Sequence, residues 1–470
     1  MLLVAAAGAL YWFLSGDGIR RALERQATAW LGEPVRIGRA SAVLLPHVAI
    51  GLRDIQVGEP VRMTLGSVDV SAPLRALLSR RIEDAELVVS DSRIEMPLPF
   101  TLPSGDGAVP SIRTIGLRDV TLASRGREIR ISADSSLANT QLTLSRLTAT
   151  AGETNLEANG TIALAPRIDA TVTARASMLD VDDLLALVSA FTDPSGAPAS
   201  ASGPGARVTA TITAQRGRLA GVALGRLAGQ VVAEGGQIAI DPLSFDVFGG
   251  HQNGWLDAQL GDTLQVRVGV SVSNLDVAQL AAFGNAPGAI TGRLTGSGRF
   301  GARGRDMRAV LASARGVGEV RIADGTMQGL DIVRTVIRFF GRPATGEPAS
   351  GERFDELAGN FAVADGVVRS DDLTLRSADF DVFARGTLKL DAKALDGRAD
   401  LALSEALSVQ AGRDLYRYTR AGTRVVLPAT IGGTLARPRV SIDAAAALQR
   451  GVLNEVERRL RNLLDRVDSR

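Results

Sequence analysis

Residues 354–403 read FDELAGNFAVADGVVRSDDLTLRSADFDVFARGTLKLDAKALDGRADLAL and carry the clearest structural signal in the chain. Between residues 380 and 392 nearly every second residue is apolar or small, and the residues between them are polar or charged, with Phe383 as the exception. Successive side chains of a β-strand point to opposite sheet faces, so this alternation predicts strands with one apolar and one polar face. Turns are expected at 377–379 and 391–397.

The same alternation recurs along most of the chain, in strand-like segments from 35 to 96, from 112 to 176 and from 207 to 273. Short repeated motifs link these segments. SMLDVDDLLAL at 177–187 resembles SNLDVAQLAAF at 273–283, and each is followed, after a loop, by Pro-Gly-Ala. Repeats of this kind indicate copies of one supersecondary unit. The chain is therefore predicted to be mainly β, with antiparallel repeating sheet units and a few short helices.

Helices are expected where the spacing changes to three and four residues. Asp17 is a suitable N-cap for a helix ending at Leu31, and Gly32 is a suitable stop. Its apolar stripe consists of Ile19, Leu23, Ala27, Trp30 and Leu31. Further short helices are predicted after Asp180, after Asp276 and over residues 330–340.

Composition excludes several classes of protein. Lys plus Arg (53) nearly balance Asp plus Glu (51), and no dense basic run with interleaved aromatics occurs, which argues against a nucleic-acid partner. The chain has no cysteine, so disulfides and thiolate metal sites are excluded, and its two histidines make a histidine-based catalytic or zinc site a poor hypothesis. No metal or cofactor is expected.

Neither terminal segment follows the strand pattern. Residues 1–14, MLLVAAAGALYWFL, form an uncharged apolar run that is shorter than the roughly 18 to 20 residues needed to span a bilayer. We interpret residues 1–16 as an uncleaved membrane anchor, truncated at its start, with a buried core helix as the alternative. The anchor residues are Leu2, Leu3, Val4, Leu10, Tyr11, Trp12, Phe13 and Leu14.

Residues 444–470 are predicted to form an amphipathic helix, because Leu453, Val456, Leu460, Leu463, Leu464 and Val467 recur at helical spacing. Two interpretations stay open for this helix. It either covers an edge or end of the sheet, or docks onto a membrane surface or onto a periplasmic or outer-membrane protein.

Candidate catalytic motifs have simpler structural explanations. Residues 296–301 fit GxGxxG, but without a surrounding βαβ unit the pattern favours a β-turn in a glycine-rich hairpin. The acidic pair Asp371–Asp372 is explained by a strand start rather than by metal binding. The chain is therefore not predicted to be an enzyme.

The ordered motifs resemble those of the AsmA family of bacterial envelope proteins. The resemblance is carried by the series FDEL, VADGVV, DDLTLRS, GTLKLDA and LDGRADLAL within 354–403, by ADGTMQGLDIVRTV at 323–336 and by VLPATIGGTLARPRVSID at 426–443. The apolar N-terminal run and LLPHVAIGLRDIQVG at 44–58 match that family's anchor and first strands. The resemblance implies an inner-membrane anchor at 1–16, a helix and first strands at 17–103, a middle array at 104–206, a C-terminal β-domain at 207–443 and a terminal helix at 444–470.

Larger members of that family resemble bridge-like lipid-transfer proteins, which implies an elongated, taco-like β-groove that conducts phospholipid through the periplasm toward the outer membrane. Its predicted lining consists of Ile162, Leu164, Val172, Ile212, Val266, Val268, Val270, Val272, Leu294, Val363, Leu373, Leu375, Phe380, Val382, Leu388, Leu390, Leu401 and Leu403. Two alternatives stay open: the same positions form the closed core of a sandwich or barrel, or the protein is a non-enzymatic scaffold for outer-membrane protein assembly.

Overall fold

The computed structural model describes residues 17–43, 48–72, 85–96, 112–124, 126–165, 167–183, 206–261, 263–305, 307–328, 332, 352–405, 408, 420–421, 424–443, 445–446 and 449. These residues are mainly β, with few short helices, as the alternation predicts. The chain divides into two compact units, Met1–Leu243 and Ser244–Arg470. The division lies inside strand β12 (Gln237–Val247).

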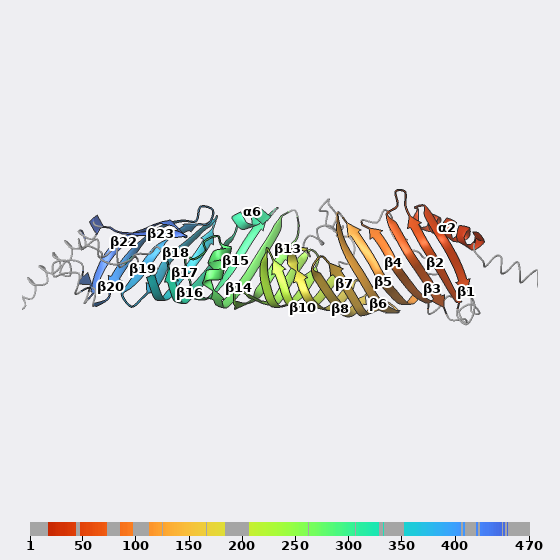
Figure 1. Cartoon of the computed structure of the whole chain (residues 1–470), viewed down its shortest axis with the longest axis horizontal. Helices are drawn as coiled ribbons and strands as arrows, with labels where there is room; N and C mark the ends of the chain where they lie inside the picture. The colour runs from red at the N-terminus through yellow and green to blue at the C-terminus, as the bar shows by residue number, and fades with distance from the viewer. Residues whose placement is uncertain are drawn as a thin grey trace, which may run out of the picture. The chain divides into compact units, whose positions relative to one another are not determined.

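The first unit is an open sheet in which chain neighbours pair (Figure 1). Its strands are β1 (Val35–Val43), β2 (Val48–Val57), β3 (Met63–Ala72), β4 (Ala85–Glu95), β5 (Ile112–Ser124), β6 (Arg127–Ala138), β7 (Gln141–Ala151), β8 (Thr154–Ala163), β9 (Asp169–Asp180), β10 (Arg207–Leu219) and β11 (Val222–Glu234). Most pairs are antiparallel, but β4–β5 and β9–β10 are parallel, which corrects the wholly antiparallel prediction. Residues 96–111 and 181–206 separate these pairs, and parallel neighbours need such a long connection to return the chain to the same end of the sheet.

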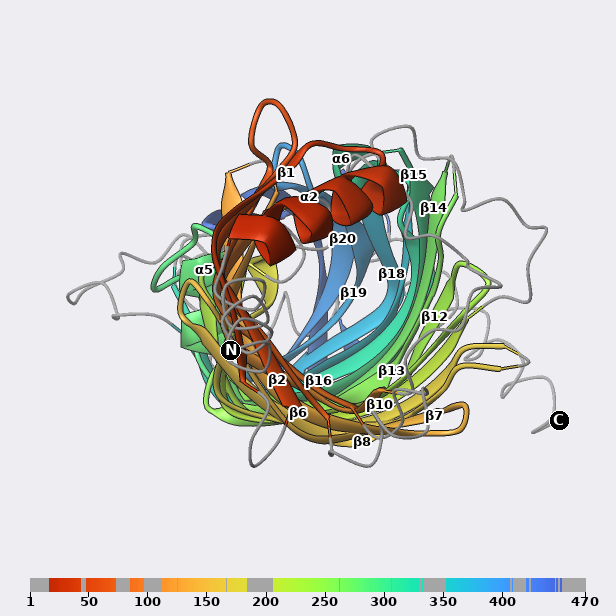
Figure 2. The same ribbon diagram turned by 90° about the vertical axis from the view of Figure 1, so that its right-hand side faces the viewer.

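The second unit repeats the arrangement with antiparallel pairs, and its strands bend along their length (Figure 2). Its strands are β13 (Gly250–Gln259), β14 (Leu264–Asp276), β15 (Arg293–Gly304), β16 (Arg315–Met327), β17 (Glu352–Ala364), β18 (Val367–Arg376), β19 (Phe380–Lys389), β20 (Ala394–Leu403), β22 (Arg424–Thr434) and β23 (Arg437–Ile442). The two-residue strand β21 (Arg420–Ala421) pairs with β22.

The stretch 354–403 forms β17 to β20, as predicted. Strands β19 and β20 pair without interruption from Phe380↔Leu403 to Lys389↔Ala394. The predicted turn at 391–397 is shorter in the structure, because β20 already begins at Ala394. The pairings of Leu388 with Leu395 and of Gly386 with Gly397 extend the ladder into that segment.

One-residue β-bulges keep apolar side chains on one face where their spacing changes from two to three residues. In β5 the register shifts between Leu117 and Val120, and Asp119 has a φ of 52°. In β14 it shifts between Val272 and Leu275, and Asn274 has a φ of 57°. Asp and Asn tolerate this left-handed conformation better than other non-glycine residues.

The described part of the chain contains three named helices. Helix α2 (Asp17–Leu31) has the predicted bounds, and Leu23, Ala27 and Leu31 pack on Val35, Ile37, Ile55 and Val57 of β1 and β2 (Figure 2). Helix α5 (Val277–Phe283) is capped by Asp276 as predicted, and α6 (Met307–Ala312) contacts β15. Among the described residues, no helix has both the length and the apolar character that crossing a membrane requires.

Several predictions fall outside the described residues. These are the anchor at 1–16, most of the helices predicted after Asp180 and over 330–340, and most of the terminal helix at 444–470. Besides the wholly antiparallel pairing, one further prediction is wrong. The motif at 296–301 is not a turn but the middle of β15, where it pairs with β14 and β16.

Candidate apolar binding face

The pairing register sorts the side chains of the second unit onto two sheet faces. Residues that lie directly opposite each other on neighbouring strands share a face. Val268 pairs with Phe300, Phe300 with Gly316, Gly316 with Val363, Val363 with Val368 and Val368 with Leu388. We call the face that holds this row the apolar face, and the opposite one the polar face.

The apolar face has a buried strip along one end of its strands. It consists of Ile322, Phe354, Leu375, Phe380, Leu401, Leu403, Val425 and Leu427, each 7% exposed or less. Val277 at the start of α5 and Ile332 belong to the same cluster, and Ile290 and Met327 pack against it. This strip is a closed hydrophobic core that anchors the unit.

The rest of the apolar face is only half-buried. This half-buried strip consists of Val266, Val268, Val270, Val272, Phe300, Phe361, Val363, Val368, Leu388 and Leu395. A second layer packed on a sheet buries such side chains as fully as those of the buried strip. The half-buried strip therefore presents apolar surface that the described residues leave partly accessible, in a row running from β14 to β20.

Glycines make room for the two aromatic rings of this strip. A Cβ added to Gly298 would lie 2.7 Å from Cε2 of Phe300, and one added to Gly318 would lie 2.7 Å from Cζ of Phe361. The two rings stack with centroids 6.2 Å apart and an interplanar angle of 22°. The rings therefore lie over the backbone of β15 and β16, where larger residues would displace them.

Except for Leu390, the predicted lining residues of the second unit lie on the apolar face, but they divide between its two strips. Val266, Val268, Val270, Val272, Val363 and Leu388 belong to the half-buried strip, together with the half-buried Leu373, which packs on Ala384 and Ala399. Leu375, Phe380, Leu401 and Leu403 are core residues of the buried strip, and Leu294 and Val382 pack against it. Leu390 lies beyond the end of β19 and is 49% exposed.

In the first unit, the predicted residues also share one face. Ile162 pairs with Ala170, Gly160 with Val172, and Ala174 with Ile212, so the three predicted side chains line neighbouring strands. Ile162, Val172 and Ile212 are half-buried, and Ile212 packs on Ala176, Leu179 and Ala214. Leu164 follows β8 and is 45% exposed.

Sequence reasoning missed Phe300 and Phe361, the largest side chains of the half-buried strip. Apolar or small residues occupy positions 294, 296, 298, 300 and 302, and polar residues occupy positions 295, 297 and 299, so the period of two was present in β15. The glycines at two of these positions suggested a turn instead. In a strand, such glycines mark a close approach by another group, and here that group is an aromatic ring.

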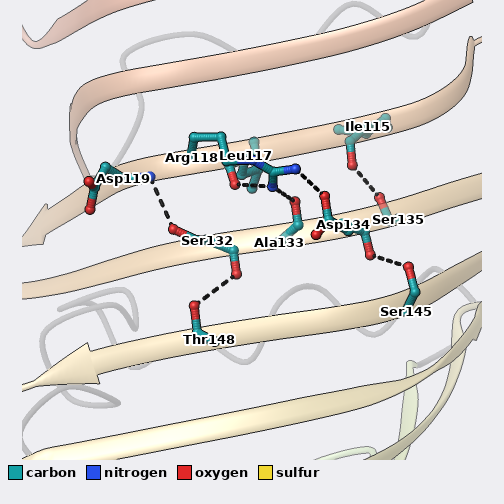
Figure 3. Close-up of polar contacts among 10 residues, drawn as sticks. All are labelled: Ile115, Leu117, Arg118, Asp119, Ser132, Ala133, Asp134, Ser135, Ser145 and Thr148. Atoms are coloured by element: carbon teal, nitrogen blue, oxygen red, sulfur yellow. Dashed lines mark hydrogen bonds and ion pairs between the residues drawn. The ribbon is translucent and has the colours of Figure 1, made fainter.

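The polar face of the first unit carries a repeated arginine–aspartate pair. Arg118 binds Asp134 on the next strand, and its Nη1 also donates to the carbonyl oxygens of Leu117 (3.1 Å) and Ala133 (3.2 Å) (Figure 3). Arg53 repeats this with Asp69 (2.9 Å) and the Leu52 carbonyl (3.3 Å). The tetrapeptide Gly-Leu-Arg-Asp at 51–54 and 116–119 is the sequence signal for this repeat.

Ser and Thr hydroxyls complete this polar surface. Ser145 donates to Asp134 and Thr148 to Ser132, each to a backbone carbonyl oxygen of the neighbouring strand (Figure 3). Ser135 makes the same kind of hydrogen bond to the Ile115 carbonyl oxygen from the apolar face, where it pairs with Ile115 and Leu144. Water-exposed pairs of this kind add little stability individually. They mark the face of the sheet that is turned to water, and the apolar side chains lie on the opposite face.

The described residues contain no group of three or more His, Asp or Glu side chains that could hold a metal ion. No protein-family model, curated protein or solved structure matches the chain. The chemistry of the site therefore rests on its own geometry, which offers an extended apolar surface on one face of a sheet.

Proposed function

We propose that this protein binds the acyl chains of phospholipid on the half-buried strip and conducts lipid along it. In this proposal the protein is attached to the bacterial inner membrane, lies in the periplasm and delivers phospholipid toward the outer membrane. The observation that carries the proposal is the row of half-buried apolar side chains from Val266 to Leu395. A contiguous apolar surface of this kind marks an interaction site when it is not covered by protein.

The energetics favour such a surface for lipid. Moving an acyl chain into water costs about 0.8 kcal/mol per methylene, so a sixteen-carbon chain costs on the order of 13 kcal/mol. Branched and aromatic side chains such as Val268 and Phe300 would remove most of that cost by contact with the chain. The lipid headgroup would stay in water, because the half-buried strip is partly open to solvent along its length.

The strip's composition also suits a sliding ligand. Its half-buried side chains are hydrocarbon, so neighbouring positions along the row offer nearly equivalent contacts. Hydrophobic attraction is non-directional and scales with the apolar area that is buried. An acyl chain would therefore pass from one strand to the next over small barriers.

Charged substitutions on the two faces of the same strand test the proposal. Val268→Asp places a carboxylate on the half-buried strip, whereas Gln265→Asp places one on the polar face of β14. Leu388→Asp and Thr387→Asp form the same pair on β19. Phospholipid that co-purifies with the full chain is quantified by mass spectrometry, and thermal unfolding checks that each variant is folded.

We expect Val268→Asp and Leu388→Asp to lose about tenfold or more of the bound phospholipid, because a carboxylate is costly to bury beside an acyl chain. Gln265→Asp and Thr387→Asp should keep wild-type lipid. If the folded wild-type protein holds no lipid, or if all four variants retain it equally, the proposal is wrong and a scaffold role becomes the better explanation.

A further inference from the structure

The second unit contains a hollow lined mainly by residues of the polar face, together with Val270 and Phe361 of the half-buried strip. It has a volume of about 940 Å³ and extends across β13 to β18. Trp255 pairs with Gly269, Gly269 with Arg299, Arg299 with Val317, and Val317 with Ala362, so these residues share the polar face. Its volume lies within the range of about 300–1,000 Å³ typical of small-ligand sites.

Trp255 forms an aromatic platform in this hollow. A Cβ added to Gly269 would lie 2.5 Å from Cε2 of the indole, so the ring lies over the Gly269 backbone. Val317 lies two strands from Gly269 and is 63% exposed, and Arg299 stands between them on β15. Two apolar patches, one at Trp255 and one at Val317, thus interrupt a face that is otherwise polar.

Planar polar side chains lie between and beside the two apolar patches. The guanidinium of Arg299 has no hydrogen bond or ion pair within the described part of the chain. Glu319 accepts a hydrogen bond from Ser297 (2.9 Å), which uses one of its two carboxylate oxygens. Asn360 donates to Asp372 (2.6 Å), and its side-chain carbonyl oxygen has no partner among the described residues.

The charges of the hollow nearly cancel. Arg299 and Arg369 carry positive charge, and Glu319, Asp371 and Asp372 carry negative charge. Arg369 is already paired with Asp371 at 3.0 Å. A phosphate-rich ligand would meet three carboxylates here, and an acyl chain would meet charged side chains, so a neutral polar ligand fits this hollow best.

Sugars combine the two properties that this hollow complements. One face of a sugar ring carries C–H groups, which are attracted to the negative face of an aromatic ring. Its rim carries hydroxyls, which donate to carboxylates and accept from guanidinium and amide groups. We propose that the hollow binds a short neutral saccharide, with one ring against Trp255 and hydroxyls on Arg299, Glu319 and Asn360.

Isothermal titration of the full-length protein with maltotriose, cellotriose and chitotriose tests this proposal. We expect saturable binding of at least one trisaccharide at concentrations up to about 10 mM, the range of weak specific sites. Trp255→Ala should weaken it about tenfold or more, and Arg299→Gln about threefold or more. Phe383→Ala and Arg303→Gln are matched controls, because Phe383 is 51% exposed on the polar face of β19 and Arg303 lies on β15, both outside the hollow.

Two results would overturn the proposal: no binding of any of the three sugars, or equal weakening by Trp255→Ala and Phe383→Ala. A fluorescence titration of the Trp12→Phe/Trp30→Phe protein, in which Trp255 is the single tryptophan, must also show a saturable change. The saccharide proposal and the lipid proposal can be tested independently. Val268→Asp should leave saccharide binding unchanged, and Trp255→Ala should leave bound phospholipid unchanged.

Discussion

Single glycines decide where aromatic side chains lie in the second unit. Gly298 and Gly318 leave room for Phe300 and Phe361 on the apolar face, and Gly269 leaves room for Trp255 on the polar face. Gly325 does the same for Phe354 of the buried strip. Glycine ordinarily weakens a strand, so its use at these positions indicates that the packed ring contributes more than the lost strand propensity.

Gly325→Ala should destabilise the second unit. The new Cβ would lie 2.6 Å from Cε2 of Phe354 and 2.5 Å from the Thr291 carbonyl oxygen, and Phe354 is only 2% exposed. Overpacking of this kind costs about 1–3 kcal/mol. Chemical denaturation measures the loss in the free energy of unfolding.

The matched control is Gly301→Ala on β15, whose new Cβ would meet only the Val266 carbonyl oxygen, at 3.8 Å. We expect it to be neutral or stabilising by up to about 1 kcal/mol, because alanine lowers the entropy of the unfolded chain. Equal losses in the two variants would show that Phe354 is not held as the structure places it.

The same residues show what one sequence can reveal. The face of Val268, Leu388 and the other β14 and β19 positions followed from alternation alone. Alternation did not show which of these side chains are core and which are half-buried, because Leu388 and Leu401 have the same sequence pattern. Their burial differs because α5, Ile290, Met327 and Ile332 cover one end of the strands, and that packing is set by tertiary contacts.

At the level of elements, single residues determine where one element ends and the next begins. Helix α5 follows β14 directly, and Asp276 ends the strand and caps the helix by accepting a hydrogen bond from the Ala278 N–H (2.9 Å). Burial alone would raise the pKa of Asp276, but hydrogen bonds from the Ala278 backbone and from Gln279 lower that pKa below its ordinary value of 3.8.

Asp276→Ala should reduce the free energy of unfolding by about 1 kcal/mol at neutral pH, the usual cost of losing an N-cap. Because the pKa of Asp276 is lower in the folded state, its stabilisation is present above the unfolded value near 3.8 and is lost as pH falls through the folded value. The difference between wild type and Asp276→Ala should therefore shrink in acid. Denaturation curves at neutral pH and below pH 3 check this, and a constant difference would contradict the carboxylate's role.

Strand pairing was only partly predictable at this scale. Strand existence, the bounds of α2 and the cap of α5 followed from local patterns. The parallel pairs β4–β5 and β9–β10 did not, because nothing in the paired segments encodes chain direction. The bulges at Asp119 and Asn274 are visible as changes of spacing, but a spacing change can equally mark a turn.

At the level of the whole molecule, each unit is a sheet with one apolar face, and in each the predicted lining residues that lie within strands fall on that face. The second unit adds a distinction that the alternation lacked: its apolar face is a closed core at one strand end and half-buried elsewhere. The buried strip only stabilises the fold, whereas the half-buried strip also offers apolar surface to a ligand. We propose that lipid occupies this half-buried strip.

Photo-crosslinking along β14 shows directly whether lipid occupies the half-buried strip. A photoreactive amino acid is placed singly at Gln265, Val266, Arg267, Val268, Val270 or Ser271, and lipid adducts on the purified full chain are identified by mass spectrometry. Positions 266, 268 and 270 point to the apolar face, and positions 265, 267 and 271 to the polar face. We predict phospholipid adducts at 266, 268 and 270 only. Equal labelling of both faces, or no labelling on either face of the folded protein, would show that lipid does not occupy the half-buried strip.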